Sequence, residues 1–556
     1  MSSTQKKILL ALWMMVRDEA GSIGQTIESC ASSVDCVVLI DTGSTDGTVY
    51  EAMRACRECE LTLHVYEEPF VDFATTRNRC MELAAAHAEW LLMLNGDETV
   101  QDAERIRSYM ECINIGDAVN VEVDFGDITF RHPRITRAGA ACRYEGRTHE
   151  ALIGAQVFGT VPVAKIVRGT EDMEKKRKQW ERDEILLGED LIEDPDAPRA
   201  QFYLAQTLRL LGREGAAARF YRARANNERG WIAERYESLL QLAEIETIDA
   251  DDHLTRAIEL CPEWPDAYTL IAEHYFKQGR WQSCYLYAKR ACELHWTGTT
   301  LFSRKRLDLL RWDLLSASAF YAKDGRLGRQ ATLMALNKDG SDEKRLRNTF
   351  RFYYPGSLPV QGSAVVVVGT GRSGTSVVTN ILETLGVDMG PSIPADKNAP
   401  DGYGEDRHVR MYGLSFDWEG LWAYLVARIE NVHGPVGCKS PYIAEDAENF
   451  SKHVPNLQKL IVINCERDLS STLASFETAW GKHPARTMEW LKRRRDGGRK
   501  LASIYNGLTV PLDQLRQRPA YWVQIIADHV FGGISLENEE MHDRIAEATR
   551  LVRPTA

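Results

Sequence analysis

Four groups of polar residues within the first 150 positions combine the residue types that bind nucleotides and divalent metal ions. They are Asp41 and Asp46, Arg77 and Asn78, Asn95 with Asp97 and Glu98, and His149 with Glu150. An acid at a strand end can accept hydrogen bonds from a ribose or a base, and the Gly and Ser after Asp41 allow a tight turn there. Carboxylate oxygens suit Mg²⁺ or Mn²⁺, which act as Lewis acids on bound phosphate groups. A carboxylate can also take a proton from a hydroxyl group, and the sequence leaves both Glu98 and Glu150 open for that role.

A fifth group lies far downstream, in the segment GTGRSGTS at residues 369–376. It stands between a buried strand pattern and a helix pattern, which is the context that a phosphate-binding loop requires. Backbone N–H groups at the start of the helix can hold phosphate oxygens, and Arg372 supplies positive charge. The glycine spacing fits the loop of nucleoside triphosphatases, but Thr375 stands where that loop has its lysine. A kinase or an ATPase is therefore disfavoured.

Alternating strand and helix patterns must position the four N-terminal groups and the downstream loop. In the first third, strands are predicted at residues 8–16, 37–40, 61–66 and 90–94, with helices at 23–33, after the 41–48 loop and at 74–88. This order favours a mostly parallel sheet that binds ligands at the carboxyl ends of its strands. The alternation returns near the C-terminus, with strands predicted at 364–368 and 460–464 and a helix at 377–385.

Residues 175–350 show only helical spacing, and an internal repeat runs through them. Ala223, Ala257 and Ala291 lie 34 residues apart, Pro262 falls at a repeat boundary, and residues 312–325 form a degenerate copy. A helix–turn–helix period of that length resembles tetratricopeptide repeats, which stack and bury one another's apolar faces. Two roles stay open with equal weight: a spacer, or a groove for an acceptor or a protein partner.

The N-terminal motifs, in their order and spacing, resemble family 2 glycosyltransferases of the GT-A fold over about residues 8–155. The matching segments are D-T-G-S-T-D-G-T at 41–48, F-V-D-F-x-x-x-R-N at 70–78, N-G-D-E at 95–98 and Y-x-G-x-x-H-E at 144–150. The resemblance implies transfer of a sugar from a nucleotide-sugar donor, with a UDP-sugar favoured. It also implies roles for individual residues: Asp41 and Asp46 in the donor site, Arg77 and Asn78 near the base or diphosphate, Asp97 on a Mn²⁺ or Mg²⁺ ion, and His149 as a further metal ligand.

Asn95 departs from that family, which has Asp at the position. An amide oxygen can still bind a ribose or a metal, but it contributes no charge. We therefore expect an active glycosyltransferase and keep a degenerate or altered site as the alternative.

The downstream loop resembles the 5′-phosphosulfate loop of sulfotransferases, over about residues 363–535. Supporting segments are N-A-P-D-G-Y-G-E at 398–405, G-C-K-S-P at 437–441, R-D-L-S-S-T-L-A-S at 467–475, and 510–519 near the end, although Leu469 replaces the usual proline. The implied donor is 3′-phosphoadenosine 5′-phosphosulfate (PAPS). The implied roles are Arg372, Ser373, Gly374, Thr375 and Ser376 on the 5′-phosphosulfate, Arg372 and Lys439 on the transition-state charge, Arg467 and Ser475 on the 3′-phosphate, and Glu405 or, second, His408 as the base.

Length and charge limit the remaining possibilities. A chain of 556 residues should hold three or four domains at roughly 100–200 residues each, and we predict three: residues 1–170, 171–355 and 356–556. The expected class is multidomain α/β, namely a Rossmann-like GT-A domain, an all-α helical-repeat middle and a P-loop-like α/β sulfotransferase domain. A net charge of −12 disfavours bulk binding to nucleic acid or to anionic membranes.

Cysteine usage and hydropathy predict the compartment. Twelve cysteines show no repeating spacing, and the single C-x-x-C at 56–59 has no second pair, which favours reduced thiols. The apolar run 8–16 is followed at once by Arg17, Asp18 and Glu19, so a buried strand is a better interpretation than a secretion signal. No run reaches the ~18 apolar residues that span a bilayer. We expect a cytoplasmic protein.

Together these patterns predict a bifunctional transferase that attaches a sugar and a sulfuryl group to a glycan, peptide or small-molecule acceptor. Two alternatives remain. In the first, only the sulfotransferase end is active and the GT-A domain is a binding module. In the second, the chain is a repeat-based scaffold with vestigial domains.

Overall fold

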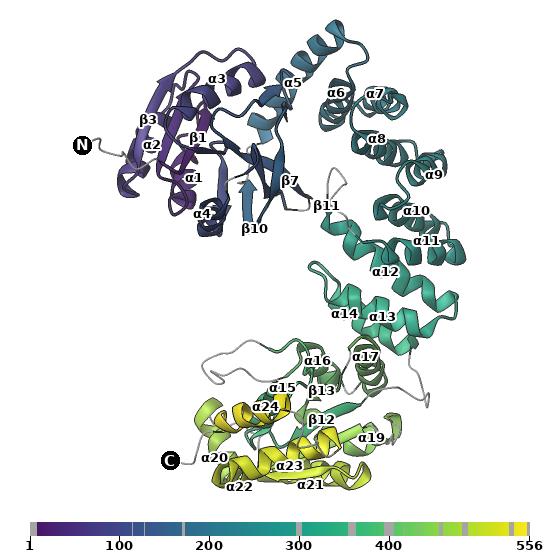
Figure 1. Cartoon of the computed structure of the whole chain (residues 1–556). Helices are drawn as coiled ribbons and strands as arrows, with labels where there is room; N and C mark the ends of the chain where they lie inside the picture. The colour runs from purple at the N-terminus through teal and green to yellow at the C-terminus, as the bar shows by residue number, and fades with distance from the viewer. Residues whose placement is uncertain are drawn as a thin grey trace, which may run out of the picture. The chain divides into compact units, whose positions relative to one another are not determined.

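The computed structural model describes residues 8–113, 115–126, 128–168, 173–295, 303–353, 363–393, 405–415, 417–432, 434–454, 460–480, 487–532 and 539–552. The chain forms two compact units (Figure 1). The N-terminal unit comprises residues 1–274 with 290–308, and the C-terminal unit comprises 275–289 with 309–556. The three predicted domain boundaries stay predictions beside this division.

Half of the N-terminal sheet is parallel, as predicted. Its strands are β1 (Leu10–Val16), β2 (Cys36–Asp41), β3 (Thr62–Glu67) and β4 (Trp90–Met93), in the order β3-β2-β1-β4. Helices α1 (Ile23–Cys30), α2 (Thr48–Glu58) and α3 (Phe73–Ala85) connect them (Figure 1). Leu12 packs with α1 and α2 on one face, and Trp13 packs with α3 on the other. Because both faces are covered, β1 is apolar throughout rather than alternating.

The other half of this sheet was not predicted, and it makes the sheet mixed. It contains β5 (Glu98–Gln101), β6 (Ala118–Asp124), β7 (Ile128–Arg137) and β10 (Val157–Arg168), with β11 (Ser303–Arg304) paired to β7 and α4 (Ala103–Cys112) between β5 and β6. The order continues β4-β7-β6-β10-β5, and the pairs β4–β7, β6–β7 and β5–β10 are antiparallel. The prediction of a mostly parallel sheet is therefore wrong for the whole sheet. β6 and β7 follow each other through a short turn, which can join only antiparallel neighbours.

A small hairpin beside the main sheet carries the H-E motif. Strands β8 (Arg143–Glu145) and β9 (Ala151–Ile153) pair antiparallel, so residues 146–150 form the loop between them. We call residues 146–150 the hairpin loop.

A series of helices follows, as the periodicity predicted. They are α5 (Met173–Glu193), α6 (Pro198–Leu210), α7 (Glu214–Asn226), α8 (Ile232–Ile245), α9 (Ala250–Leu260), α10 (Pro265–Lys277), α11 (Trp281–Glu293), α12 (Lys305–Tyr321), α13 (Gly325–Leu336) and α14 (Glu343–Thr349), and a 3₁₀ turn at Phe350–Tyr353 ends the series. Ala257 and Ala291 are fully buried, as a repeat position should be. Ala223 is exposed, so the 34-residue register does not extend to the first pair.

The C-terminal unit contains a parallel sheet among its helices, in line with the predicted α/β class. Its strands are β12 (Ala364–Gly369), β13 (Val436–Lys439), β14 (Leu460–Glu466) and β15 (Leu508–Pro511), in the order β13-β12-β14-β15. The surrounding helices are α15 (Thr375–Thr384), α16 (Arg407–Ser415), α17 (Trp418–Asn431), α18 (Pro441–Glu445), α19 (Ala447–His453), α20 (Leu469–Trp480), α21 (Met488–Ile504), α22 (Leu512–Gln517), α23 (Pro519–Phe531) and α24 (Glu539–Arg550). Val366 packs with α17 and Val367 with α15, so both faces of β12 are covered.

The core of the C-terminal unit also takes in side chains that precede residue 356. Leu336 of α13, Leu346 of α14 and Phe350 pack in the same cluster as Val366 and Trp422. The last helices of the predicted repeat region thus cover one face of the second sheet.

Two further features concern the whole chain. Within the described ranges, no helix is both long enough and apolar enough to cross a membrane. All twelve cysteines are described, and each is a free thiol.

Candidate active sites

The first candidate site lies where β1, β2 and β4 end. Asp41 is the last residue of β2 and is largely buried, and its carboxylate accepts a hydrogen bond from the Ser44 backbone N–H at 3.1 Å and another from the Ser44 hydroxyl. Asp46 accepts from the backbone N–H groups of Thr48 at 2.9 Å and Ala20 at 3.1 Å. Hydrogen bonds from Thr48 hold the pKa of Asp46 below its usual value. Asp46 therefore shapes this loop, and its contact with a donor stays a prediction.

Arg77 links three of the predicted motifs. It projects from α3 and is 8% exposed, and its Nη2 donates to Asn95 Oδ1 at 3.1 Å. Its Nη1 lies 2.9 Å from Met93 Sδ, and its Nε forms an ion pair with Glu150 Oε1. A buried guanidinium requires such partners, because an unpaired buried charge is costly. The structure thus brings Arg77, Asn95 and Glu150 together.

Glu98 belongs to a buried ion pair, and this corrects its prediction as a possible base. Its side chain is fully buried, and both oxygens accept from Arg134 of β7, at 2.8 and 2.9 Å. Oε2 also accepts from the Asn95 backbone N–H at 2.9 Å. A carboxylate held in this way cannot receive a proton from an acceptor hydroxyl at the surface, so Glu150 is the remaining candidate base. Arg134 was missed because nothing in its local sequence marks it.

The Asn78 side chain hydrogen-bonds to the backbone of the hairpin strand β8. Its Oδ1 accepts from the Tyr144 backbone N–H at 2.8 Å, and its Nδ2 donates to the Tyr144 carbonyl at 2.9 Å. The side-chain amide thus pairs with a strand backbone as a neighbouring strand does. Its predicted proximity to the base or diphosphate is untested by this arrangement and stays a prediction.

A complete protein cage for a metal ion is not formed by the described residues, among which no group of three or more His, Cys, Asp or Glu side chains could hold one. Asp97 is partly exposed on the turn between β4 and β5. Mg²⁺ commonly uses one or two carboxylates together with substrate phosphates and water, so Asp97 fits as the protein's contribution.

His149 does not join Asp97 in such a group. Its ring stacks on Tyr203 with centroids 4.2 Å apart and an angle of 8°. Burial, together with the nearby Arg199, lowers the pKa of His149 to about 4, so the imidazole is neutral near pH 7. The prediction of His149 as a metal ligand therefore receives no support from the structure.

The second candidate site is the loop between β12 and α15. Gly371, Arg372 and Gly374 have φ values of 71°, 55° and 94°. Left-handed backbone is common in loops whose N–H groups bind anions. Arg372 Nε donates to Ser475 Oγ of α20 at 3.0 Å, so the two predicted phosphate motifs meet. Ser373 Oγ is buried and has no hydrogen-bond partner among the described residues.

Lys439 and Glu405 border the same loop. Lys439 ends β13, its Nζ donates to Ser376 Oγ at 2.9 Å, and it lies 3.6 Å from Glu405 Oε1. Glu405 Oε2 lies 4.0 Å from Arg410. Burial lowers the pKa of Lys439, an effect that the Glu405 carboxylate opposes. Of the predicted segment 398–405, only Glu405 lies within the described residues.

His408 is placed elsewhere, which corrects its prediction as a second base. It is fully buried on α16, where its ring packs against Tyr424 and its Nδ1 lies 3.5 Å from Arg347. Burial lowers its pKa to about 4. An acceptor hydroxyl has no route to a ring enclosed in this way.

Arg467 lines a hollow of about 420 Å³ at the ends of β14 and β15. Arg495 and Arg499 of α21 also line it, and Arg499 pairs with Glu466 at 2.6 Å. Arg467 Nε is buried and has no hydrogen-bond partner in the described part of the chain. Sequence reasoning missed Arg495 and Arg499, although the basic run 492–500 could have marked them.

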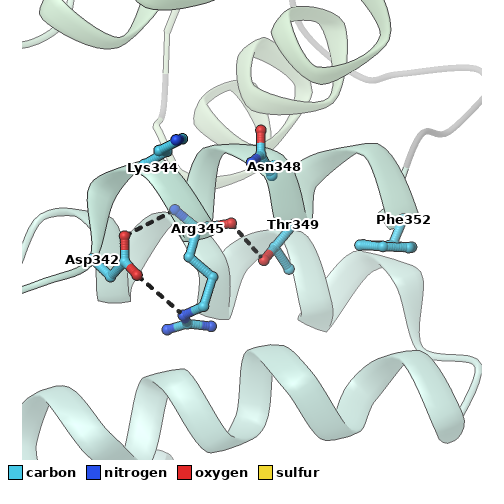
Figure 2. Close-up of a pocket in the computed structure, with 6 residues that line it drawn as sticks. All are labelled: Asp342, Lys344, Arg345, Asn348, Thr349 and Phe352. Atoms are coloured by element: carbon cyan, nitrogen blue, oxygen red, sulfur yellow. Dashed lines mark hydrogen bonds and ion pairs between the residues drawn. The ribbon is translucent and has the colours of Figure 1, made fainter.

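A separate hollow of about 330 Å³ lies along α14 (Figure 2). In Figure 2, Asp342 faces Arg345, accepting from its backbone N–H at 3.0 Å. The Arg345 guanidinium also pairs with Asp313 at 2.7 Å. None of the predicted site residues lines this hollow.

Parts of the chain are similar to known proteins. No protein-family model matches the chain. The SPbeta prophage-derived glycosyltransferase SunS of Bacillus subtilis is 22% identical over 235 residues, which cover 40% of this chain and 54% of SunS. The chain thus spans about half the length of this relative. A TPR repeat-containing protein of Synechococcus elongatus is 34% identical over 89 residues, covering 16% of this chain and 20% of that protein. The chain is therefore similar in part to a glycosyltransferase and in part to a repeat protein.

Solved structures give weaker likenesses. TarS from S. aureus has a TM-score of 0.25 at 14% identity, covering 50% of this chain and 54% of that chain. The mannosyltransferase PcManGT from Pyrobaculum calidifontis, in complex with GDP-Man and Mn²⁺, has a TM-score of 0.27 at 16% identity, covering 46% of this chain and 86% of that chain. Superpositions at these TM-scores do not define a shared fold.

The pair Glu98–Arg134 generates a stability prediction. Glu98→Gln removes the charge that balances a buried guanidinium, so we expect a loss of about 3–5 kcal/mol in the free energy of unfolding. Glu104→Gln, at an exposed position, is the matched control and should stay within about 0.5 kcal/mol of wild type. Urea unfolding of the full chain measures both variants. Equal midpoints would show that the buried pair does not stabilise the N-terminal unit.

The loop at 369–376 generates a second prediction. Gly374→Ala places a Cβ 2.5 Å from Leu512 Cδ1 and puts a side chain at φ +94°. We expect a cost of about 2 kcal/mol from strain and overpacking. Gly434→Ala is the control, because its added Cβ meets nothing within 4 Å. Thermal unfolding should show a lower midpoint for the first variant alone, and an unchanged midpoint would contradict the left-handed geometry of the loop.

Proposed function

We propose that the N-terminal unit transfers a sugar from a nucleotide-sugar donor, a UDP-sugar in the first instance, to an acceptor hydroxyl. The observation that carries this proposal is the meeting of Asn95, Arg77 and Glu150 through one buried guanidinium at the strand ends. The partial similarity to a glycosyltransferase supports it. The finer assignments rest on the resemblance of the motifs.

The residues divide the work of such a transfer. Asp41 receives the nucleoside, and Asp97 would hold a divalent ion. When bound, that ion would supply Lewis-acid stabilisation of the leaving group. Arg77 holds Glu150 through Oε1, so Oε2 is the oxygen that can take the acceptor's proton. The acceptor oxygen then bonds to the anomeric carbon, and the bond to the diphosphate breaks with its electron pair.

The neutral side chain of Asn95 affects which carboxylate pairs with Arg77. Its amide accepts from Arg77 without adding a negative charge, so Arg77 keeps Glu150 as its ionic partner. An aspartate there would compete with Glu150 for the guanidinium. This arrangement favours a working site, and a degenerate binding module is the alternative that the activity test decides.

We propose sulfuryl transfer from PAPS as the function of the C-terminal unit. The specific observation is the bond between Arg372 and Ser475, with Ser373 Oγ and Arg467 Nε buried and unpartnered among the described residues. Polar atoms in that state suit an anionic ligand, because burial without a partner is costly. Gly374, Thr375 and Ser376 complete the loop at the start of α15.

In this proposal the reaction is an in-line displacement at sulfur. Glu405 takes the proton from the acceptor hydroxyl, and the acceptor oxygen bonds to sulfur. The bond from sulfur to the phosphate oxygen breaks, and adenosine 3′,5′-bisphosphate leaves. Arg372 and Lys439 stabilise the charge that gathers on the oxygens.

Both proposed reactions act on hydroxyl groups, so one glycan or glycosylated acceptor could receive both products. A glycan, a peptide and a small molecule all fit this requirement. The helical repeats offer a surface for such an acceptor or for a protein partner. Sulfate transfer that depends on prior glycosylation would support a sequential order of the two steps.

Asp97 generates the test of glycosyl transfer. We expect the wild type to hydrolyse or transfer from one member of a panel of UDP- and GDP-sugars with Mn²⁺, and Asp97→Ala to be slower by about 100-fold or more. Glu104→Ala, which removes an exposed acid, should match wild type. Identical rates for wild type and Asp97→Ala would remove the metal assignment. An inactive wild type across the panel would favour the binding-module alternative.

Arg372 generates the test of the second proposal. Calorimetry with adenosine 3′,5′-bisphosphate should show binding to wild type, weakened about 10–100-fold in Arg372→Ala, because a hydrogen bond to a charged group contributes about 1.5–3 kcal/mol. Arg345→Ala, in the hollow on α14, is the control and should bind normally. Undetectable binding to wild type would overturn the proposal and favour a scaffold.

A further inference from the structure

The hairpin loop, residues 146–150, is enclosed by helices that lie outside the predicted GT-A domain. Three consecutive residues, Arg147, Thr148 and His149, contact α5 or α6, while Glu150 turns back to Arg77. Glu150, the candidate base, thus pairs with Arg77 of α3. The side chains of the three residues before it contact α5 or α6.

The first two contacts come from α5. Arg147 forms ion pairs with Asp190 and Glu193, and its carbonyl accepts from the Phe73 backbone N–H at 3.0 Å. Thr148 Oγ1 donates to Asp183 Oδ1 at 3.1 Å. Asp183 is 2% exposed. These contacts connect α5 to the hairpin loop at two successive residues.

The third contact comes from Arg199 of α6. Its Nε donates to the His149 carbonyl at 2.7 Å, and its Nη1 lies 3.1 Å from Glu234 Oε1 of α8. The guanidinium lies over the rings of Tyr203 at 4.7 Å and Trp231 at 4.9 Å. Glu234 is 2% exposed, so the carboxylate that pairs with Arg199 lies in a packed interior.

His149 needs such support, because its backbone is unfavourable. Its φ is +50°, a conformation that costs a residue with a Cβ free energy and persists only where the surroundings impose it. Tyr203 stacks on the ring, and Arg199 holds the carbonyl of the same residue. The peptide that begins at this carbonyl continues directly into Glu150.

We infer that α5 and α6, the first helices of the helical region, are part of the glycosyl-transfer site, with Arg199 as the positioning residue that orients Glu150 through the His149 carbonyl. This inference rests on the proposed function of the N-terminal unit. A base must lie within hydrogen-bond reach of the proton it takes, and a misplacement of about 1 Å can cost about 100-fold in rate. The repeats at this end are thus more than a spacer.

The test compares Arg199→Ala and Arg199→Lys with Arg209→Ala in the full-length protein. Arg209 lies on the same helix and also pairs with α8, at 2.8 Å from Glu244, but it has no contact with the hairpin loop. Lysine keeps the charge beside Glu234 but lacks the planar fork that contacts Glu234 and the His149 carbonyl together.

Two measurements separate positioning from stability. We expect hydrogen exchange at the amides of residues 146–151 to be faster in Arg199→Ala and unchanged in Arg209→Ala. We also expect Arg199→Ala to lower kcat for the active nucleotide sugar about 10–100-fold with KM for the donor little changed, and Arg199→Lys to recover part of the loss.

Each outcome bears on one of the two claims. Equal exchange rates in Arg199→Ala and Arg209→Ala would overturn the positioning role, whatever the activity. Faster exchange with an unchanged kcat would overturn its catalytic consequence. A wild type without turnover would instead overturn the proposed function, while the exchange comparison would still report whether Arg199 holds the loop.

Discussion

The buried guanidinium of Arg77 is the interaction on which the N-terminal site depends. A positive charge that is 8% exposed must be satisfied locally, and its partners come from the end of β4, from Asn95 and from the hairpin loop. Three segments separated by up to 73 residues are therefore drawn to one point. The helical repeats then support that point from outside, through Arg199 and the His149 carbonyl.

Two arginines beside Met93 Sδ pair with carboxylates that differ in burial. Arg134 is paired with Glu98, which is completely enclosed, whereas Arg77 is paired with Glu150, whose side chain keeps 11% exposure. The first pair contributes to the core. The second pair keeps some exposure, which the proposed role of Glu150 as a base requires.

The C-terminal site is organised differently, by backbone conformation. Residues 371, 372 and 374 of the loop after β12 are left-handed, and Lys439 and Ser475 approach this loop from β13 and α20. Among the described residues, Ser373 Oγ and Arg467 Nε are buried without a hydrogen-bond partner. The N-terminal site pairs its charges internally, whereas this site contains two buried polar atoms that lack such a partner.

The sequence by itself determined the parallel strands, the helical middle and the loops at strand ends, because these follow from local hydrophobic periodicity and from glycine and acid placement at turns. The resemblance of the motifs also placed Arg77, Asn95 and Glu150 in one predicted donor site, along with residues such as Asn78 and His149 that the structure does not bring to Arg77. It could not separate Glu98 from Glu150, place His408 in the core, or reveal the antiparallel half of the first sheet. Those outcomes depend on partners such as Arg134 and Arg347, which lie 36 and 61 residues away along the chain. Only the tertiary structure decides such pairings, because burial and charge balance depend on contacts for which the local sequence carries no pattern.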